Sequence, residues 1–325
     1  MLPQFYSLNE YLNATFGEKV YKLALNGGMT CPNRDGVIDT RGCIFCSVGG
    51  SGDFAGGGQT VDKGLGPFAD GKVDDSHLPR ITEQIEAAKA LVQSKYSGNS
   101  YIAYFQAFTN TYAPIDYLRR IFTEAILHPD IVCLSIATRP DCLDDEIIAL
   151  ISELNTIKPV WIELGLQTIH ERSATYIRRG YPLSVFERSI AMLNTAKITT
   201  IVHMIIGLPH ETPEDIYATA SYLSRMNIQG VKLQLLHVLR GTDLADDYAN
   251  GLFKTLSLDE YIAILGHVIE LLPKDIVIHR ITGDGPKNQL IAPLWSANKR
   301  NVLNLIEREF KLQGIEQGKL FDYQK

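Results

Sequence analysis

The sequence predicts an α/β protein, a partial TIM-like (β/α)6 barrel followed by a small C-terminal α+β extension. Two observations lead to this prediction. Short runs of β-branched and aromatic residues alternate with longer segments of helical spacing, which is typical of a parallel sheet covered by helices. Six such units occur before the alternation ends near residue 245, fewer than a closed eight-fold barrel contains.

The elements follow in regular order, with the barrel expected over residues 1–245 and the extension over 246–325. Strands are predicted over 20–28, 101–108, 131–138, 159–168, 199–209 and 230–239. Helices are predicted over 77–96, 114–127, 144–155, 183–196 and 213–226, then over 257–272 and 298–312 in the extension, which also holds a strand over 277–281. Folds of this kind build their active sites at the C-terminal ends of the strands.

Composition places the chain among ordinary globular proteins, with 325 residues, 45% of them hydrophobic and 21% charged. No apolar run approaches the roughly 20 residues of a membrane span, and the N-terminus lacks the features of a signal peptide. We therefore expect a cytoplasmic protein. The net charge is −6, but the segment from Lys287 onward carries seven Lys or Arg against four acids.

Three cysteines, Cys31, Cys43 and Cys46, follow the first predicted strand at the spacing C-x11-C-x2-C. Such clustering indicates a metal rather than a disulfide framework. Three thiolates on a [4Fe–4S] cluster leave one iron open for a small molecule. A structural zinc site, which needs four protein ligands, is the alternative that the spacing leaves open.

With these motifs the chain resembles the radical SAM superfamily, and most closely its YhcC/YtqA type and the radical SAM domain of the Elongator catalytic subunit. The resemblance runs from KLALNGGMTCPNRDG to the C-terminal helix. It implies a partial barrel of the radical SAM type with a [4Fe–4S] cluster and S-adenosylmethionine (SAM) as cofactors. It also implies that Phe45 packs beside the SAM adenine. The long gap between the first two cysteines departs from the usual CxxxCxxC.

Polar residues at the end of the second strand are candidates for binding SAM. Relatives carry a Gly-Gly-Glu there, whereas this chain has Gln106, Thr109 and Asn110. The alternative is a capped strand end, because Thr and Asn favour turns. At the third strand, Arg139 and Asp141 are either binding residues or a structural ion pair.

The fourth strand carries WIELGLQT, similar to the ELGxQ of oxygen-independent coproporphyrinogen oxidase and its relatives. The resemblance implies that Gln167 and Arg179 contact SAM. Glu163 lies on the same strand face as Gln167 and needs a partner, since an unpaired acid in an apolar strand is costly. His203, before the GLP turn, binds the nucleoside part of SAM or is a core histidine.

Four further residues are interpreted from position. Cys133 and Cys142 are expected to be structural, since a buried cysteine behaves as a small hydrophobe. Arg240 and Thr242 are expected to face the substrate. The Gly-rich stretch over residues 49–71 is predicted to be a long loop that closes the site as a lid.

The resemblance implies reductive cleavage of SAM to a 5′-deoxyadenosyl radical, with flavodoxin or ferredoxin as the electron donor. The Elongator-like features suggest tRNA as the substrate, with modification of a wobble uridine, and the basic tail would then contact phosphates. Two alternatives remain, a radical SAM enzyme acting on a small metabolite or tetrapyrrole, and a non-catalytic zinc-stabilised RNA-binding protein.

Overall fold

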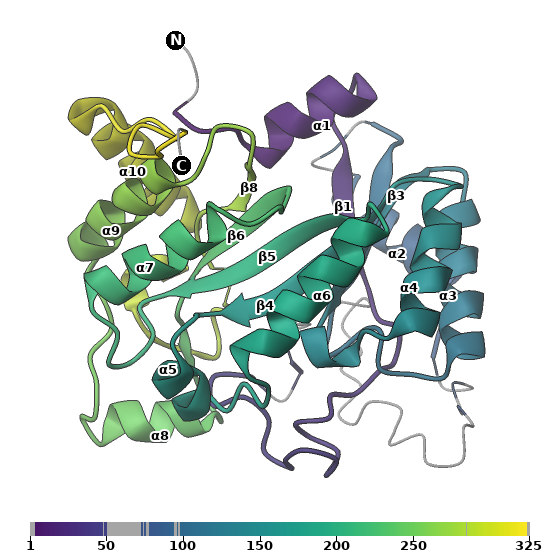
Figure 1. Cartoon of the computed structure of the whole chain (residues 1–325), viewed down its shortest axis with the longest axis horizontal. Coiled ribbons are helices and arrows are strands. Elements are labelled where there is room, and N and C mark those ends of the chain that lie inside the picture. Colours follow the sequence, from purple (N-terminus) through teal and green to yellow (C-terminus); the bar gives the residue numbers. More distant parts are fainter. Residues whose placement is uncertain are drawn as a thin grey trace. The chain divides into compact units, whose positions relative to one another are not determined.

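The computed structural model describes residues 4–47, 49–50, 73, 75, 78–93, 96, 98–283 and 285–323. The main sheet has seven strands in the order β1-β2-β3-β4-β5-β6-β8 (Figure 1). These strands are β1 (Tyr21–Leu25), β2 (Tyr101–Phe105), β3 (Ile131–Thr138), β4 (Val160–Gln167), β5 (Thr199–Ile206), β6 (Gly230–Leu235) and β8 (Val277–Arg280). A two-stranded antiparallel ladder joins β7 (Val238–Leu239) to β9 (Leu290–Ala292).

Helices connect the strands, as the alternating pattern predicts. They are α1 (Leu8–Phe16), α2 (Ile81–Val92), α3 (Ile115–Leu127), α4 (Asp145–Asn155), α5 (Glu171–Tyr176), α6 (Leu183–Thr195), α7 (Pro213–Leu223), α8 (Asp243–Ala249), α9 (Leu258–Leu271) and α10 (Lys299–Gln313). Side chains cap several of them: Asp144 accepts from Ile147 N at the start of α4, and Thr212 and Ser257 form capping boxes at α7 and α9.

The predicted parallel α/β fold is confirmed, with differences in detail. The segment over 230–239 is not one strand, because the chain turns after Leu235 and resumes as β7. The strand predicted within the extension is β8, which pairs in parallel with β6 and so belongs to the main sheet. The short helices α1, α5 and α8 are not predicted from the sequence. The predicted boundary at residue 245 remains a prediction.

Two compact units can be distinguished in the chain. The first, here called the cysteine-loop unit, comprises Leu12–Gly165 and Ser184–Thr200. The second, the C-terminal unit, comprises Met1–Tyr11, Leu166–Leu183 and Ile201–Lys325. Strand β4 passes from one to the other.

The core of the cysteine-loop unit forms around β2, whose five residues are all buried. Helix α3 turns its apolar face to the sheet, and the Phe105 and Phe122 rings meet edge to face at 5.0 Å. Apolar burial on both faces is what a parallel strand covered by helices requires. The sheet thereby holds the C-terminal ends of β1, β2 and β3 side by side.

The C-terminal unit is tied together by Gln317. Its side-chain oxygen accepts from Tyr6 N at 2.7 Å, and its amide nitrogen donates to Pro273 O and Ile276 O at 2.7 and 2.8 Å. These bonds connect the segment before α1 to the chain around β8.

No helix in the described part of the chain is long and apolar enough to cross a membrane.

Candidate functional site

The three clustered cysteines lie on a loop that the backbone itself closes. Arg34 N donates to Cys31 O at 2.7 Å, Gly42 N to Asn33 O at 2.7 Å, and Cys46 N to Cys43 O at 3.0 Å. Gly42 has a φ of +77°, and a side chain there would meet Arg34. The residues between the first two cysteines therefore form a loop whose two ends lie close together.

The three thiols influence one another electrostatically. Burial raises the pKa of the Cys43 thiol to about 12, and the neighbouring thiols of Cys46 and Cys31 raise it further, whereas Arg139 and Asn33 oppose the shift. Asn33 Nδ2 donates to Cys43 Sγ at 3.6 Å. Bound iron would supply the positive charge that lets these neighbouring, half-buried thiols ionise.

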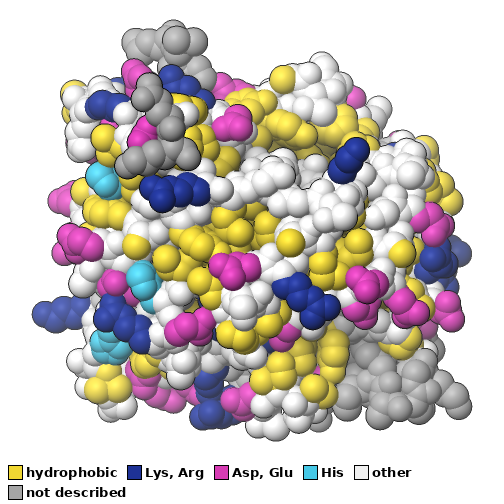
Figure 2. Space-filling model, viewed as in Figure 1, with side chains coloured by type: hydrophobic (Ala, Val, Ile, Leu, Met, Phe, Trp, Pro, Cys, Tyr) yellow, Lys and Arg dark blue, Asp and Glu magenta, His cyan; other side chains and the backbone are white. Residues whose placement is uncertain are grey.

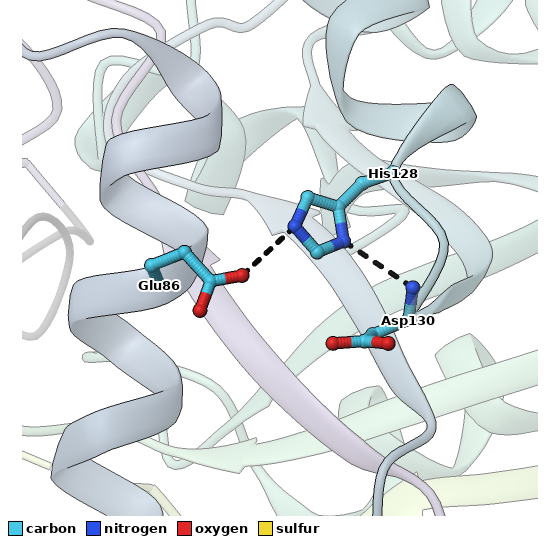
Figure 3. Close-up of side chains that lie close together, drawn as sticks. All are labelled: Glu86, His128 and Asp130. Carbon is cyan, nitrogen blue, oxygen red and sulfur yellow. Dashed lines mark hydrogen bonds and ion pairs between the residues drawn. The ribbon is translucent and has the colours of Figure 1, made fainter.

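Three cysteines are one ligand short of a structural zinc site, which takes four protein ligands. Among the described residues, only Glu86, His128 and Asp130 place three potential ligand atoms within 4.8 Å of one another (Figure 3). Three clustered cysteines, which would leave one iron of a [4Fe–4S] cluster open, fit such a cluster better than a zinc ion.

The group of Glu86, His128 and Asp130 is better explained as an ion-pair network. His128 Nε2 lies 3.0 Å from Glu86 Oε1, and Asp130 N donates to His128 Nδ1 at 3.3 Å (Figure 3). The Lys89 ammonium pairs with both carboxylates and holds the pKa of Glu86 below its usual range. Lys89 thus supplies the cation, and the network fastens α2 to the start of β3.

The end of β2 leaves one buried acceptor without a partner. Asn110 is fully buried and donates to Ala137 O through both its backbone N (3.1 Å) and its Nδ2 (2.9 Å). Its Oδ1 has no hydrogen-bond partner among the described residues. A buried oxygen without a hydrogen bond costs free energy of folding. A capping role for Asn110 explains the bonds that its two nitrogens donate, but it does not explain the oxygen.

The same turn has an unusual backbone. Ala107 and Phe108 have φ angles of +91° and +58°, the region that favours glycine. Thr109 is buried and its N donates to Thr30 O at 3.2 Å, while Gln106 is half-buried at the strand end. Two strained residues in succession at a strand end are typical of functional turns.

The end of β4, in the C-terminal unit, also combines a residue of positive φ with a buried side-chain oxygen that lacks a hydrogen-bond partner among the described residues. Gln167, its last residue, has a φ of +69°, and its buried Oε1 has no hydrogen-bond partner among the described residues. Arg179, 2% exposed, donates to Leu166 O at 3.2 Å and Thr168 O at 2.7 Å on either side of Gln167. It also donates to Tyr181 O at 3.0 Å. Arg179 therefore fixes the backbone that presents Gln167.

Glu163 has the partner that its buried position requires. Its Oε1 accepts from Lys22 Nζ and from Ser135 Oγ, each at 2.8 Å. Neither Lys22 nor Ser135 is predicted from the sequence, where the signal for Lys22 is a cation within an otherwise apolar strand.

Other predicted residues have structural contacts. Arg139 and Asp141 form a two-point ion pair at 2.9 and 2.6 Å. His203 Nδ1 lies 3.3 Å from Gln234 Nε2. Thr242 caps α8 by accepting from Ala245 N, and its contact with substrate stays a prediction.

The remaining predicted residues have environments that leave their roles as predictions. Phe45 is half-buried and Arg240 is exposed. Cys133 is fully buried, and burial raises the pKa of Cys142, with further contributions from Asp141 and Cys31. The Gly-rich stretch predicted as a lid lies outside the described residues, apart from positions 49 and 50.

The chain is similar in sequence to known families and proteins. Residues 39–223 match the Radical SAM superfamily, and residues 228–311 match the Radical_SAM C-terminal domain. The chain is 41% identical over 318 residues to the uncharacterized protein YtqA of Bacillus subtilis (strain 168), covering 98% of this chain and 93% of YtqA. It is also 24% identical over 192 residues to a tRNA uridine(34) acetyltransferase of Methanocaldococcus jannaschii, covering 57% of this chain and 34% of that protein.

Among solved structures, Elp3 of Methanocaldococcus infernus with an N-terminal deletion gives a TM-score of 0.62 at 18% identity. The match covers 73% of this chain and 60% of Elp3, and at this identity it shows the fold alone, a parallel sheet of the partial-barrel type. Proteins of the matched superfamily bind a [4Fe–4S] cluster and SAM, the cofactors that the sequence predicts. The chain belongs to the radical SAM superfamily, and within it to the YhcC/YtqA type.

Proposed function

We propose that the chain is a radical SAM enzyme that cleaves SAM reductively and directs the resulting radical at a wobble uridine of tRNA. The observation that carries the first part is the cysteine loop. Three thiols are brought together on a loop that its own backbone hydrogen bonds close, and they are one short of the four protein ligands of a structural zinc site. Cys31, Cys43 and Cys46 would hold the cluster.

The cluster, when bound, supplies the electron that splits SAM into methionine and a 5′-deoxyadenosyl radical. Neighbouring side chains of the loop hold the cysteine ligands in place. Asn33 donates to the Cys43 sulfur, and Arg34 Nη2 donates to Cys46 O at 2.8 Å and Ser47 O at 2.6 Å. These bonds fix two of the three cysteines.

SAM carries an amino group and ribose hydroxyls, all hydrogen-bond donors. Asn110 Oδ1, in the turn after β2, and Gln167 Oε1, at the end of β4, are acceptors that no described residue uses. In the cysteine-loop unit we assign Asn110 to SAM, together with Gln106, Thr109 and Phe45. In the C-terminal unit we assign Gln167 and His203 to SAM. Arg179 and Glu163 act as positioning residues. Arg179 already donates to backbone carbonyls, and Glu163 already accepts from Lys22 and Ser135.

The tRNA part of the proposal is supported by the relative that acts on tRNA uridine(34). The match covers only 34% of that relative, so its acetyl transfer is not carried over. The basic tail adds little, because Arg308 pairs with Glu309, Lys311 with Glu307 and Lys319 with Glu270. Figure 2 likewise shows Lys and Arg interspersed with Asp and Glu on the face in view.

The test is 5′-deoxyadenosine formation by the reconstituted, dithionite-reduced enzyme with two tRNA transcripts. One carries the wobble uridine, and the other carries cytidine in its place. The proposal predicts stimulation by the first transcript only, and a modified uridine in its nucleoside digest. SAM cleavage that neither transcript stimulates, with no salt-dependent tRNA binding, would contradict the tRNA substrate and turn the search to small molecules.

A further inference from the structure

The side chain of Asn33 contacts the sulfur of one proposed cluster ligand. Asn33 is 1% exposed, and its Nδ2 donates to Cys43 Sγ at 3.6 Å. Sulfur is a larger atom than oxygen and accepts hydrogen bonds at longer range. Buried amide groups normally have hydrogen-bond partners, and here a sulfur is the partner of the nitrogen. Asn33 can therefore act directly on the electron density of Cys43.

The backbone of the loop brings these two residues together without the Asn33 side chain. Gly42 N donates to Asn33 O at 2.7 Å, and Gly42 directly precedes Cys43. At the start of the loop, Arg34 N donates to Cys31 O at 2.7 Å. Both bonds join backbone atoms only. A substitution of the Asn33 side chain therefore removes the bond to sulfur and leaves these closures in place.

A hydrogen bond to a cluster ligand differs in strength between the two oxidation states of the cluster. A [4Fe–4S] cluster on three thiolates already carries a net negative charge when it is oxidised, and one added electron makes it more negative. An N–H group that donates to one of the sulfurs is attracted more strongly by the reduced form. Because Asn33 is buried, water screens this attraction only weakly. The bond therefore favours reduction.

We propose that Asn33 raises the reduction potential of the cluster by donating this hydrogen bond to Cys43. Asn33 acts through Cys43 and is thus a positioning residue. The inference rests on the proposed function, because it needs the cluster on the three cysteines. In the step concerned, one electron passes from an added reductant, which is oxidised, to the cluster, which changes from [4Fe–4S]²⁺ to [4Fe–4S]⁺. No bond forms or breaks, and Asn33 keeps its amide protons.

The experiment measures the midpoint potential of the cluster in the reconstituted protein without SAM. Dithionite is the reductant, redox dyes are the mediators, and the electron paramagnetic resonance (EPR) signal of the reduced cluster is the readout. Asn33→Leu removes the donor at similar volume, and Asn33→Gln keeps an amide donor. Asp39→Asn is the control in the same loop, where Asp39 Oδ1 accepts from Thr40 N at 2.6 Å and Arg41 N at 3.2 Å.

We expect the equilibrium constant for reduction to fall about tenfold in Asn33→Leu, which lowers the potential by about 59 mV. Asn33→Gln should show a smaller shift, and Asp39→Asn should keep the wild-type potential. A second measurement needs no variant. In wild-type protein whose asparagine side chains carry the heavy isotope of nitrogen, pulsed EPR of the reduced cluster should detect a coupling to the labelled nitrogen.

Three results would overturn the proposal. A wild-type potential in Asn33→Leu would show that the bond does not act on the cluster. An equal drop in Asp39→Asn would make the shift a general response to changes in the loop. Absence of the nitrogen coupling in the labelled wild type would show that Asn33 donates no bond to the reduced cluster, whether or not Asn33→Leu takes up iron. Failure of the proposed function looks different, because the wild-type protein would then bind no iron and give no EPR signal.

Discussion

Lys22 Nζ lies 2.8 Å from Glu163 Oε1, although β1 and β4 are separated in the sheet by β2 and β3. Strands spaced about 4.8 Å apart put β1 and β4 about 14 Å apart in a flat sheet. The two side chains therefore reach toward each other across the intervening strands. Those strands contribute too, since Ser135 donates to Glu163 and the Tyr104 ring lies 4.9 Å from Lys22 Nζ.

Lys22→Met should destabilise the fold more than Glu163→Gln does. Glu163 is fully buried, so loss of Lys22 removes a cationic partner from a carboxylate that water does not reach, at a cost of about 3–5 kcal/mol. Lys22 is 20% exposed, so water can partly replace Glu163. Urea unfolding of the cluster-free protein, followed by circular dichroism, measures both. A smaller loss for Lys22→Met than for Glu163→Gln would contradict this assignment.

Gln167→Gly should separate stability from SAM binding. A non-glycine residue in the left-handed region costs about 1–2 kcal/mol, and glycine relieves this while losing about 0.5–1 kcal/mol of chain entropy. The cluster-free variant should thus be as stable as wild type or slightly more so. The SAM affinity of the reconstituted variant, measured by equilibrium dialysis, should fall about tenfold through the lost acceptor.

Gln167→Ala is the matched control, because it removes the same oxygen and keeps the strained backbone. It should bind SAM as weakly as Gln167→Gly and be less stable. Wild-type affinity in both variants would remove Gln167 from the SAM site.

Arg179→Lys should weaken the turn after β4. Lysine cannot reproduce the planar fork that reaches Leu166 O, Thr168 O and Tyr181 O, and charged hydrogen bonds contribute about 1.5–3 kcal/mol. We expect a loss of about 2–3 kcal/mol in unfolding free energy and weaker SAM binding. Arg172→Lys, on the exposed face of α5, is the control and should change neither. Equal effects of the two substitutions would argue against a positioning role for Arg179.

Glu211 should make stability fall with rising pH. Burial raises its pKa above 4.5, although Thr168 Oγ1 donates to Glu211 Oε1 at 2.7 Å. The folded state then holds the proton more tightly than the unfolded state. Stability is therefore lost as pH rises from 4.5 through the raised folded pKa. Urea unfolding of the cluster-free protein across this window should show a flatter profile for Glu211→Gln. The exposed Glu214→Gln should keep the wild-type slope, and an unchanged slope in both would refute the prediction.

The sequence predicts the strands and longer helices well, because their apolar periodicity reflects burial directly. The strand over 131–138 and the helix over 114–127 lie within one residue of β3 and α3. Short α5 and α8 are missed because one or two turns carry too little periodicity to distinguish them from loops. The parallel pairing of β8 with β6 depends on tertiary packing that no local pattern encodes.

The site is predictable in its residue types and not in its contacts. The motif predicts Gln167, but neither its positive φ nor its unused oxygen can be read from the letters. A partner for Glu163 is required by the cost of a buried charge, yet Lys22 lies 141 residues away on a non-neighbouring strand. Only the register of the sheet brings the two together.

The central claim is tested most directly by anaerobic reconstitution with iron and sulfide, followed by iron analysis and assay of 5′-deoxyadenosine after reduction with SAM. The account predicts about four iron atoms per chain and cleavage in the wild type. Both should be retained in Cys133→Ala and Cys142→Ala and lost in Cys43→Ala. A colourless wild-type protein that binds zinc instead of iron and forms no 5′-deoxyadenosine would contradict it.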